Sequence, residues 1–448
     1  MVEKLGRAVE SSCRTSQDQQ TVLNSARLLT RIIPFIFEDQ DWNNFFWSRP
    51  DPAAKEGAQL AKRLLSAVTD LMFCPDFTVS SSRSRSREEV DELANIDSCE
   101  YIWEVGVGCA QSTAQVTQHH HNREELLRLL LTCFSESIYQ ESGRGEAVWL
   151  RVFTSPDNRH TLPLFTSLLN TVCGYQPAGV LPYNHLLWVD SKEKLVELSL
   201  QVLIVTLDDT SQRRTEDSPP DNLFLNYLSR IHREEDLQFI LSGITRLLMN
   251  PLTQTYLPGS QKKVMVSIFR QQSHYLSFYC QVHFHQELLI LFWKLCEHNR
   301  KFLYHVLKSS DVLEIVIPVL NYINDARVDQ SKAGLMHTGD ESQTVVRVVI
   351  LSSPGVFILL LLSGERNFGV RLNKPYTAAV PMDISVFSGS HADLLIIVFH
   401  KVTLSLSVSP SSTQSYRSSR LVIRDSNLSS NVFSPSSATY LRISSPCP

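Results

Sequence analysis

Residues 60–72, LAKRLLSAVTDLM, give the clearest indication of the fold. Their apolar side chains recur at intervals of three and four residues, at Leu60, Leu64, Val68, Leu71 and Met72. This spacing follows the α-helical repeat, so these side chains lie along one face of a helix. The stretch therefore predicts an amphipathic helix with an apolar stripe that another part of the chain must cover.

The same periodicity returns along most of the chain, whereas strand patterns are sparse. It occupies residues 23–37, 124–139, 162–173, 193–207, 236–249, 285–296, 312–322 and 392–400. Amphipathic helices without intervening strands can bury their stripes only against one another. We therefore expect an all-α fold, either an irregular helical solenoid of the HEAT or armadillo kind or a large helical bundle.

Polar segments divide this helical pattern. A Ser/Arg-rich loop (80–94) and an Asp/Ser/Pro-rich loop (208–221) offer little apolar surface to bury. The helical regions are then 1–79, 95–207 and 222–401, the last with atypical insertions at 264–282 and 339–354. Residues 402–448 form a Ser-rich tail, which we expect to be disordered because its apolar residues are isolated.

Composition excludes several classes of protein. Of the 448 residues, 42 are Lys or Arg and 46 are Asp or Glu, which gives a net charge of -4 and no bulk positive field for nucleic acid. The 9 cysteines are dispersed and form no C-x-x-C pair, a distribution that indicates reduced thiols in the cytosol. We expect a folded cytoplasmic protein that does not bind nucleic acid.

Membrane signals are weak. The start, MVEKLG, has no signal-peptide core, and Val2 stands where N-myristoylation requires glycine. An integral membrane protein would need residues 345–362 as its span, but Arg347, Pro354 and Gly355 interrupt that stretch. The sequence therefore predicts no transmembrane segment.

No catalytic, cofactor-binding or metal-ligating set is legible, and we expect no small-molecule substrate. Residues 119–121, all histidine, are interpreted as a solvated loop, and Gly106 and Gly108 as a turn. The alternative is an enzyme of unrecognised type. It would need a pocket that brings His185, His232 or His391 within hydrogen-bond reach of a serine or a carboxylate.

Two groups of residues are candidates for a partner or membrane surface. Arg366, Arg371 and Lys374 could form a small basic surface for acidic lipid or protein groups, with a structural loop as the simpler interpretation. Trp42 and Trp47 could anchor a protein partner if they are exposed, or serve as buried loop anchors if they are not.

Two long segments resemble the high-temperature-induced dauer formation family, whose members are dymeclin-like Golgi proteins. They are residues 222–236, NLFLNYLSRIHREED, and residues 363–376, SGERNFGVRLNKPY. Shorter matches lie at 182–187, 201–208, 250–258 and 389–395, so that the resemblance covers about residues 22–401 with interruptions.

This resemblance implies a non-enzymatic scaffold or adaptor on the cytosolic face of the Golgi, held there partly by an N-terminal myristoyl group. It further implies a role in protein sorting and in forming secretory granules, the dense-core vesicles, at the trans-Golgi network. The partners would be proteins of Golgi trafficking and the membrane itself, with no cofactor.

The chain departs from the family pattern at its start, at 264–282, at 339–354 and after Lys401. We interpret it as a truncated or mis-spliced version of a longer family member.

Overall fold

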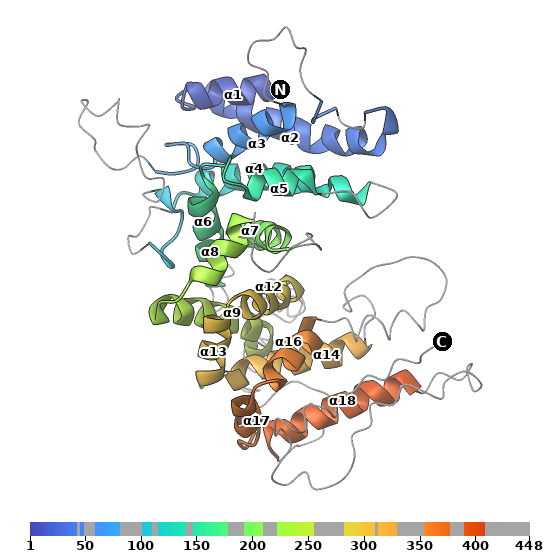
Figure 1. Ribbon diagram of the computed structural model, residues 1–448. Coiled ribbons are helices and arrows are strands. Elements are labelled where there is room, and N and C mark those ends of the chain that lie inside the picture. The colour runs from blue at the N-terminus through green and yellow to red at the C-terminus, as the bar shows by residue number, and fades with distance from the viewer. Residues whose placement is uncertain are drawn as a thin grey trace, which may run out of the picture. The chain divides into compact units, whose positions relative to one another are not determined.

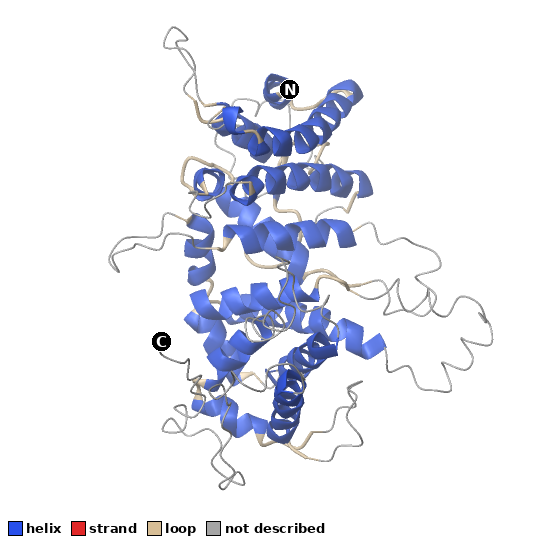
Figure 2. Ribbon diagram, turned by 90° about the vertical axis from the view of Figure 1, so that its right-hand side faces the viewer, coloured by secondary structure: helices blue, strands red, loops and turns tan. Residues whose placement is uncertain are grey.

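The computed structural model of the chain is helical throughout its described parts (Figure 1). It describes residues 1–42, 45–48, 59–80, 101–109, 115–139, 147–177, 192–208, 222–254, 282–309, 312–328, 354–376 and 389–407. Within these ranges the extended backbone amounts to isolated bridges, Pro75 with Val79, Gly106 with Cys109 and Pro375 with Ser390, and Figure 2 shows helices and loops only. The predicted all-α fold class is confirmed.

The chain forms two compact units, Met1–Gly243 and Ile244–Pro448. Unit 1 contains α1 (Val2–Glu10), α2 (Ser16–Glu38), η1 (Gln40–Trp42), α3 (Leu60–Leu71), α4 (Thr117–Phe134), η4 (Ser135–Ile138), α5 (Val148–Thr154), α6 (Thr161–Cys173), α7 (Glu193–Thr206), α8 (Leu223–Arg230) and the first half of α9 (Glu234–Gln254). Unit 2 contains the rest of α9, then α12 (His285–His298), α13 (Arg300–Lys308), α14 (Val312–Val328), α16 (Pro354–Ser363), α17 (Arg366–Leu372) and α18 (His391–Ser407).

Helices of unit 1 are stacked in successive layers (Figure 1). The helix α1 packs on α2 and α3, α2 packs on α4, α4 on α7, and α7 on α6, which in turn contacts α8. The stripe predicted for residues 60–72 is the buried face of α3, where Leu64, Val68 and Leu71 are fully enclosed. Each helix therefore covers the apolar face of the next, as the periodicity requires.

Unit 2 is built by the same rule from shorter helices. The helix α12 packs on α13 and α16, α14 packs on α16 and α18, and α17 touches α13, α16 and α18. Asn299 caps α13 by accepting a hydrogen bond from the backbone N–H of Phe302, which starts this helix directly after α12 ends.

The predicted end of the last helical region differs from the structure. The helix α18 runs to Ser407, past the predicted limit at residue 401, because Val402 is buried and continues its apolar face. The insertions at 264–282 and 339–354, the two polar loops and the tail beyond Ser407 lie outside the described residues, apart from their terminal positions. The predicted segmentation at those loops therefore stays a prediction.

Gly243 lies where α9 comes close to the end of α6. A Cβ atom at this position in α9 would lie 2.4 Å from the carbonyl oxygen of Cys173, at the end of α6. Because backbone atoms on both sides would have to move, only glycine fits there.

We predict that Gly243→Ala lowers the free energy of unfolding by about 1–3 kcal/mol, the usual cost of overpacking. Gly6→Ala is the matched control, because Gly6 lies in α1 with no atom within 4 Å of the added methyl group. That change should stabilise the protein by up to about 1 kcal/mol through helix propensity alone. Urea unfolding followed by circular dichroism measures both, and equal effects would contradict the packing argument.

Candidate functional site

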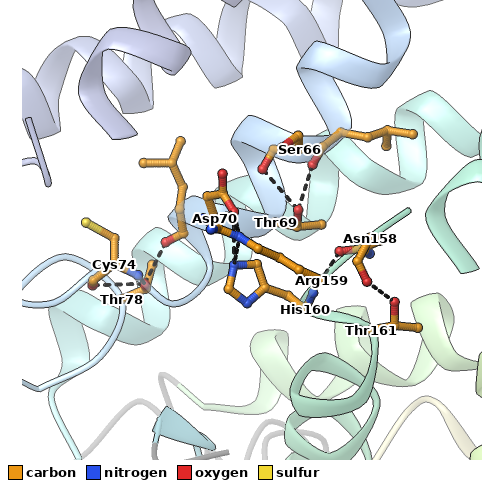
Figure 3. A network of polar contacts seen from close by, with 11 residues as sticks. Ser66, Thr69, Asp70, Cys74, Thr78, Asn158, Arg159, His160 and Thr161 are labelled. Atoms are coloured by element: carbon orange, nitrogen blue, oxygen red, sulfur yellow. Dashed lines mark hydrogen bonds and ion pairs between the residues drawn. The ribbon is translucent and has the colours of Figure 1, made fainter. Parts of the chain in front are cut away.

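A network of polar contacts joins the end of α3 to the start of α6 (Figure 3). One carboxylate oxygen of Asp70 accepts hydrogen bonds from Arg159 Nε at 3.0 Å and Nη2 at 2.7 Å, and it lies 2.9 Å from His160 Nε2. The His160 ring stacks on Phe73, with ring centroids 5.2 Å apart. Asp70 thus fastens the loop before α6 to α3.

An Asp–His pair also occurs in hydrolase triads, where the aspartate orients the histidine. In such a triad the second ring nitrogen faces a nucleophile. Here Nδ1 of His160 is buried and has no hydrogen-bond partner among the described residues. In the described part of the chain the pair therefore contacts no hydroxyl or thiol that it could activate, and its geometry suits a structural contact between helices.

The ionisation of Asp70 reflects this contact. Burial by itself raises the pKa of its carboxyl group, but hydrogen bonds from His160 and Arg159 and their positive charge outweigh burial, so that the pKa is lowered. Asp70 is therefore held as a carboxylate at neutral pH.

A buried arginine organises the neighbouring loop of residues 72–79. Arg123, on α4, donates from Nε to the carbonyl oxygen of Thr78 at 2.8 Å and places its guanidinium 4.8 Å from the ring centre of Trp103. Asn122 beside it donates to the carbonyl oxygen of Phe77 at 2.8 Å. Burial lowers the pKa of Arg123 to about 9, with Glu104 opposing that shift, so the side chain stays charged at neutral pH.

The second loop on this side, residues 101–109, is held by Asn170 of α6. The amide oxygen of Asn170 accepts from the backbone N–H of Val107 at 2.8 Å, and its nitrogen donates to the carbonyls of Glu104 and Val107, each at 3.1 Å. Gly106 and Gly108 have positive φ and form the predicted turn. The turn is confirmed, and it is fixed by a helix side chain.

The histidine run was wrongly predicted as a solvated loop. The helix α4 starts at Thr117, so His119 and His120 lie in its first turns and are buried. Only His121 reaches the side of the helix that Arg27 of α2 approaches, at 3.0 Å between Nε2 and Nη2. The helix therefore begins before residue 124, where the periodic stretch was predicted to start. The reason is that its first turns are buried against neighbouring elements, which periodicity alone does not show.

The histidines named for an alternative enzyme are not joined to a nucleophile where the structure describes them. His232 Nδ1 contacts the carbonyl oxygen of Arg230 at 2.8 Å, and His391 Nδ1 contacts that of Lys374 at 2.9 Å. His185 lies outside the described residues. His232 therefore contacts the backbone two residues before it, and His391 contacts the backbone of the segment that follows α17.

Most of the described cysteine side chains are buried. The cysteines that the structure describes are free, and Cys13, Cys74, Cys133, Cys173 and Cys296 are buried. Burial raises the pKa of the Cys133 and Cys296 thiols, which keeps them in the unreactive protonated form. Within the described ranges no group of His, Cys, Asp and Glu side chains could hold a metal ion, and no helix is both long and apolar enough to cross a bilayer.

The two tryptophans singled out in the sequence have different environments. Trp42 is 50% exposed and makes an edge contact with Phe45. Trp47 packs edge-on against the buried Trp149, with ring centroids 5.2 Å apart. Trp42 is therefore available to a partner, whereas Trp47 anchors its loop to α5.

The three basic candidates lie on and beside α17, so this segment is a short helix where the simpler interpretation was a loop. Arg366 and Lys374 are exposed. Arg371 is half-buried, and its guanidinium donates to the carbonyl oxygens of Lys308 and Ser309 at the end of α13. Arg371 thus caps another helix, a role that depends on a contact between segments distant in the sequence.

Sequence reasoning also missed exposed residues on two other helices. Leu28, Ile32 and Phe35 form an outward apolar stripe on α2, and Phe35 is 72% exposed. The helix α13, RKFLYHVLK, turns its basic residues outward. The spacing of Leu28, Ile32 and Phe35 at four and three residues is visible in the sequence, but only packing shows which face of each helix is left uncovered.

These features define a protein of packed helices in which the described buried charges and amides hold loops and helix ends. The model of the high-temperature-induced dauer-formation protein family matches residues 1–424. The chain therefore belongs to this family, and the resemblance seen at residues 222–236 and 363–376 is confirmed.

Individual relatives carry the same family name. Protein HID1 of Mus musculus and Protein HID1 of Homo sapiens are each 54% identical over 435 residues, which cover 90% of this chain and 51% of theirs. Protein HID1 of Dictyostelium discoideum is 28% identical over 377 residues, covering 77% of this chain and 37% of its own. The chain spans about half the length of the mammalian relatives. No solved structure matches it.

We predict that Asp70→Asn lowers the free energy of unfolding at pH 7 by about 1–3 kcal/mol, because a partly buried carboxylate loses its charge-assisted hydrogen bonds. The folded-state pKa of Asp70 is lowered, so its contribution is present above the unfolded pKa of about 4 and is lost as pH falls through the folded value. The difference between variant and unsubstituted protein should therefore shrink in acid, as urea unfolding across pH 3–7 would measure.

Asp157→Asn is the control for Asp70. Asp157 pairs with Lys62 at 3.3 Å, but both side chains are well exposed, so its loss should change stability little. A difference for Asp70→Asn that persists unchanged at the lowest pH would contradict the assigned role.

We predict that Arg123→Met destabilises the protein by about 1–3 kcal/mol, because the carbonyl of Thr78 stays buried without its donor. Arg31→Met, on the exposed side of α2, should change stability by less than about 0.5 kcal/mol. Thermal unfolding measures the pair, and an Arg123 variant as stable as its control would show that the loop is held by other contacts.

Proposed function

We propose that this chain is a non-enzymatic scaffold or adaptor that lies peripherally on the cytosolic face of the Golgi and supports protein sorting there. Its task would be the formation of secretory granules, the dense-core vesicles, at the trans-Golgi network, with proteins of Golgi trafficking as its partners. Membership of the HID1 family supports the proposal, as does a fold in which helices supply long exposed faces.

The observation that carries the proposal is the outward stripe of α2. Leu28, Ile32 and Phe35 follow one another at four and three residues, so they share one face of the helix, and each is exposed although each is large and apolar. Trp42 is exposed shortly after the same helix ends. Large apolar and aromatic side chains of this kind are the usual anchors of protein interfaces.

The polar groups support a non-catalytic role. Asp70 and Arg123 each contact backbone or side chains of neighbouring segments, and their contacts account for their burial. His232 and His391 each contact a backbone carbonyl oxygen. Within the described residues these groups therefore act as structural contacts.

The test uses secretory cells that lack their own family member and express this chain with a fluorescent tag. We expect the tagged chain to concentrate with a trans-Golgi marker and to raise the amount of cargo stored in granules. Leu28→Ser with Phe35→Ser should reduce the set of co-purifying proteins at least severalfold, because both anchors are lost.

Leu162→Ser is the matched control, since Leu162 is an exposed leucine on another helix of the same unit. It should leave co-purification unchanged. A chain that spreads evenly through the cytosol and has no effect on cargo would contradict the proposed function.

A further inference from the structure

The helix α13 has an outer face made of cations around one tyrosine. Phe302, Val306 and Leu307 point into unit 2 and are buried. Arg300, Tyr304 and Lys308 are spaced by four and therefore form an outward row, which Lys301 adjoins. Tyr304 is 66% exposed.

The stability of α13 does not explain this arrangement. Arg300 and Lys301 occupy its first turn, directly after the cap Asn299. The N-terminal end of a helix carries a partial positive charge and disfavours cations. In the part of the chain that the structure describes, neither residue forms an ion pair that would offset this repulsion.

A second row repeats the pattern on α17. Arg366 and Val370 are spaced by four on this helix, and Lys374 follows at the same interval in the turn after it. Val370 is 64% exposed. Each row thus has an exposed apolar residue between two cations.

Arg371 brings the two rows together. Its guanidinium donates to the carbonyl oxygens of Lys308 and Ser309, so that the end of α13 is fastened to α17 within unit 2. The contact also uses the negative end of the α13 dipole, where a cation is favoured. The two rows, Arg300, Lys301, Tyr304, Lys308, Arg366, Val370 and Lys374, are called the basic surface below.

We infer that the basic surface binds the headgroup layer of an anionic lipid membrane. Its cations complement acidic headgroups. They outnumber the exposed carboxylates found beside them among the described residues, Glu297 at the end of α12, Glu365 before α17 and Asp393 at the start of α18. Tyrosine is enriched at membrane interfaces, where its ring enters the apolar boundary and its hydroxyl stays in water.

Lipid is favoured over an acidic protein because both apolar residues stand within the rows of cations, with Tyr304 and Val370 free to enter the headgroup region. The inference deepens the proposed function, on which it rests, by naming the face that would meet the membrane. Vesicle binding is measured with purified components, so a failure to bind would contradict this inference alone. The proposed role in cargo sorting is tested separately by the experiment in cells.

The experiment is vesicle co-sedimentation of the purified chain. Vesicles of phosphatidylcholine alone are compared with vesicles that also contain phosphatidylserine, at low and at high salt. We expect binding only to the anionic vesicles and a decrease at high salt, because exposed charges are screened. A combined variant, Lys301→Gln, Lys308→Gln, Arg366→Gln and Lys374→Gln, should bind at least about tenfold more weakly, since each cation near such a surface contributes a factor of about five.

The control variant removes the same number of exposed cations from unit 1, with Lys4→Gln, Arg7→Gln, Arg31→Gln and Arg63→Gln. It should bind anionic vesicles as the unsubstituted chain does. Circular dichroism confirms that both variants remain folded. Equal loss in both variants would show that only net charge matters and would overturn the inference.

Two further results would also overturn it. One is equal binding to neutral and anionic vesicles. The other is an absence of vesicle binding together with retention on immobilised polyglutamate that the combined variant loses, because this would assign the basic surface to an acidic protein. A variant with Tyr304→Ser and Val370→Ser should weaken vesicle binding without changing its dependence on salt, as expected if both side chains enter the interface.

Discussion

The apolar stripes of the helices can leave water only by packing on one another, and both units depend on this constraint. In unit 1 the buried face of α3 supplies Leu64, Val68 and Leu71, and each later layer continues from the one before it. An added methyl group at Gly243 has no room because α9 lies directly against the end of α6. Because the helices pack closely, the connecting loops lie at their ends. Backbone N–H and C=O groups of these loops that are buried there need hydrogen-bond partners.

Polar side chains on the helices meet that need. Arg123 and Asn122 bind successive carbonyls of the loop after α3, and Asn170 binds both sides of the turn at Gly106 and Gly108. Asp70 joins α3 to the segment before α6. These residues have the burial, charge and shifted pKa values that often mark reaction centres, yet their partners are protein groups. Two exposed sets of side chains take no part in these contacts, the apolar stripe on α2 and the cations of the basic surface on α13 and α17.

The two surfaces suit different tasks. Apolar anchors such as Phe35 gain most from a protein partner that excludes water around them. Cations that surround a tyrosine can act on a fluid, acidic layer without a shaped groove. The proposed function calls for both kinds of surface, and the two lie on separate units. Arg371 links the second surface to the stability of unit 2, since it caps α13 while Arg366 and Lys374 remain exposed.

The sequence by itself determined the fold class, because a helical period of apolar residues is a local property that any helix must satisfy by burial. It also determined the family, since residues 222–236 and 363–376 carry that likeness as written. Only the tertiary structure decided that His119 and His120 are buried within α4, that Trp42 is exposed while Trp47 packs on Trp149, and that Arg371 serves α13. The physical reason is that periodicity shows which face of a helix is apolar, whereas the partner that covers it, and any face left uncovered, depend on residues distant in the sequence.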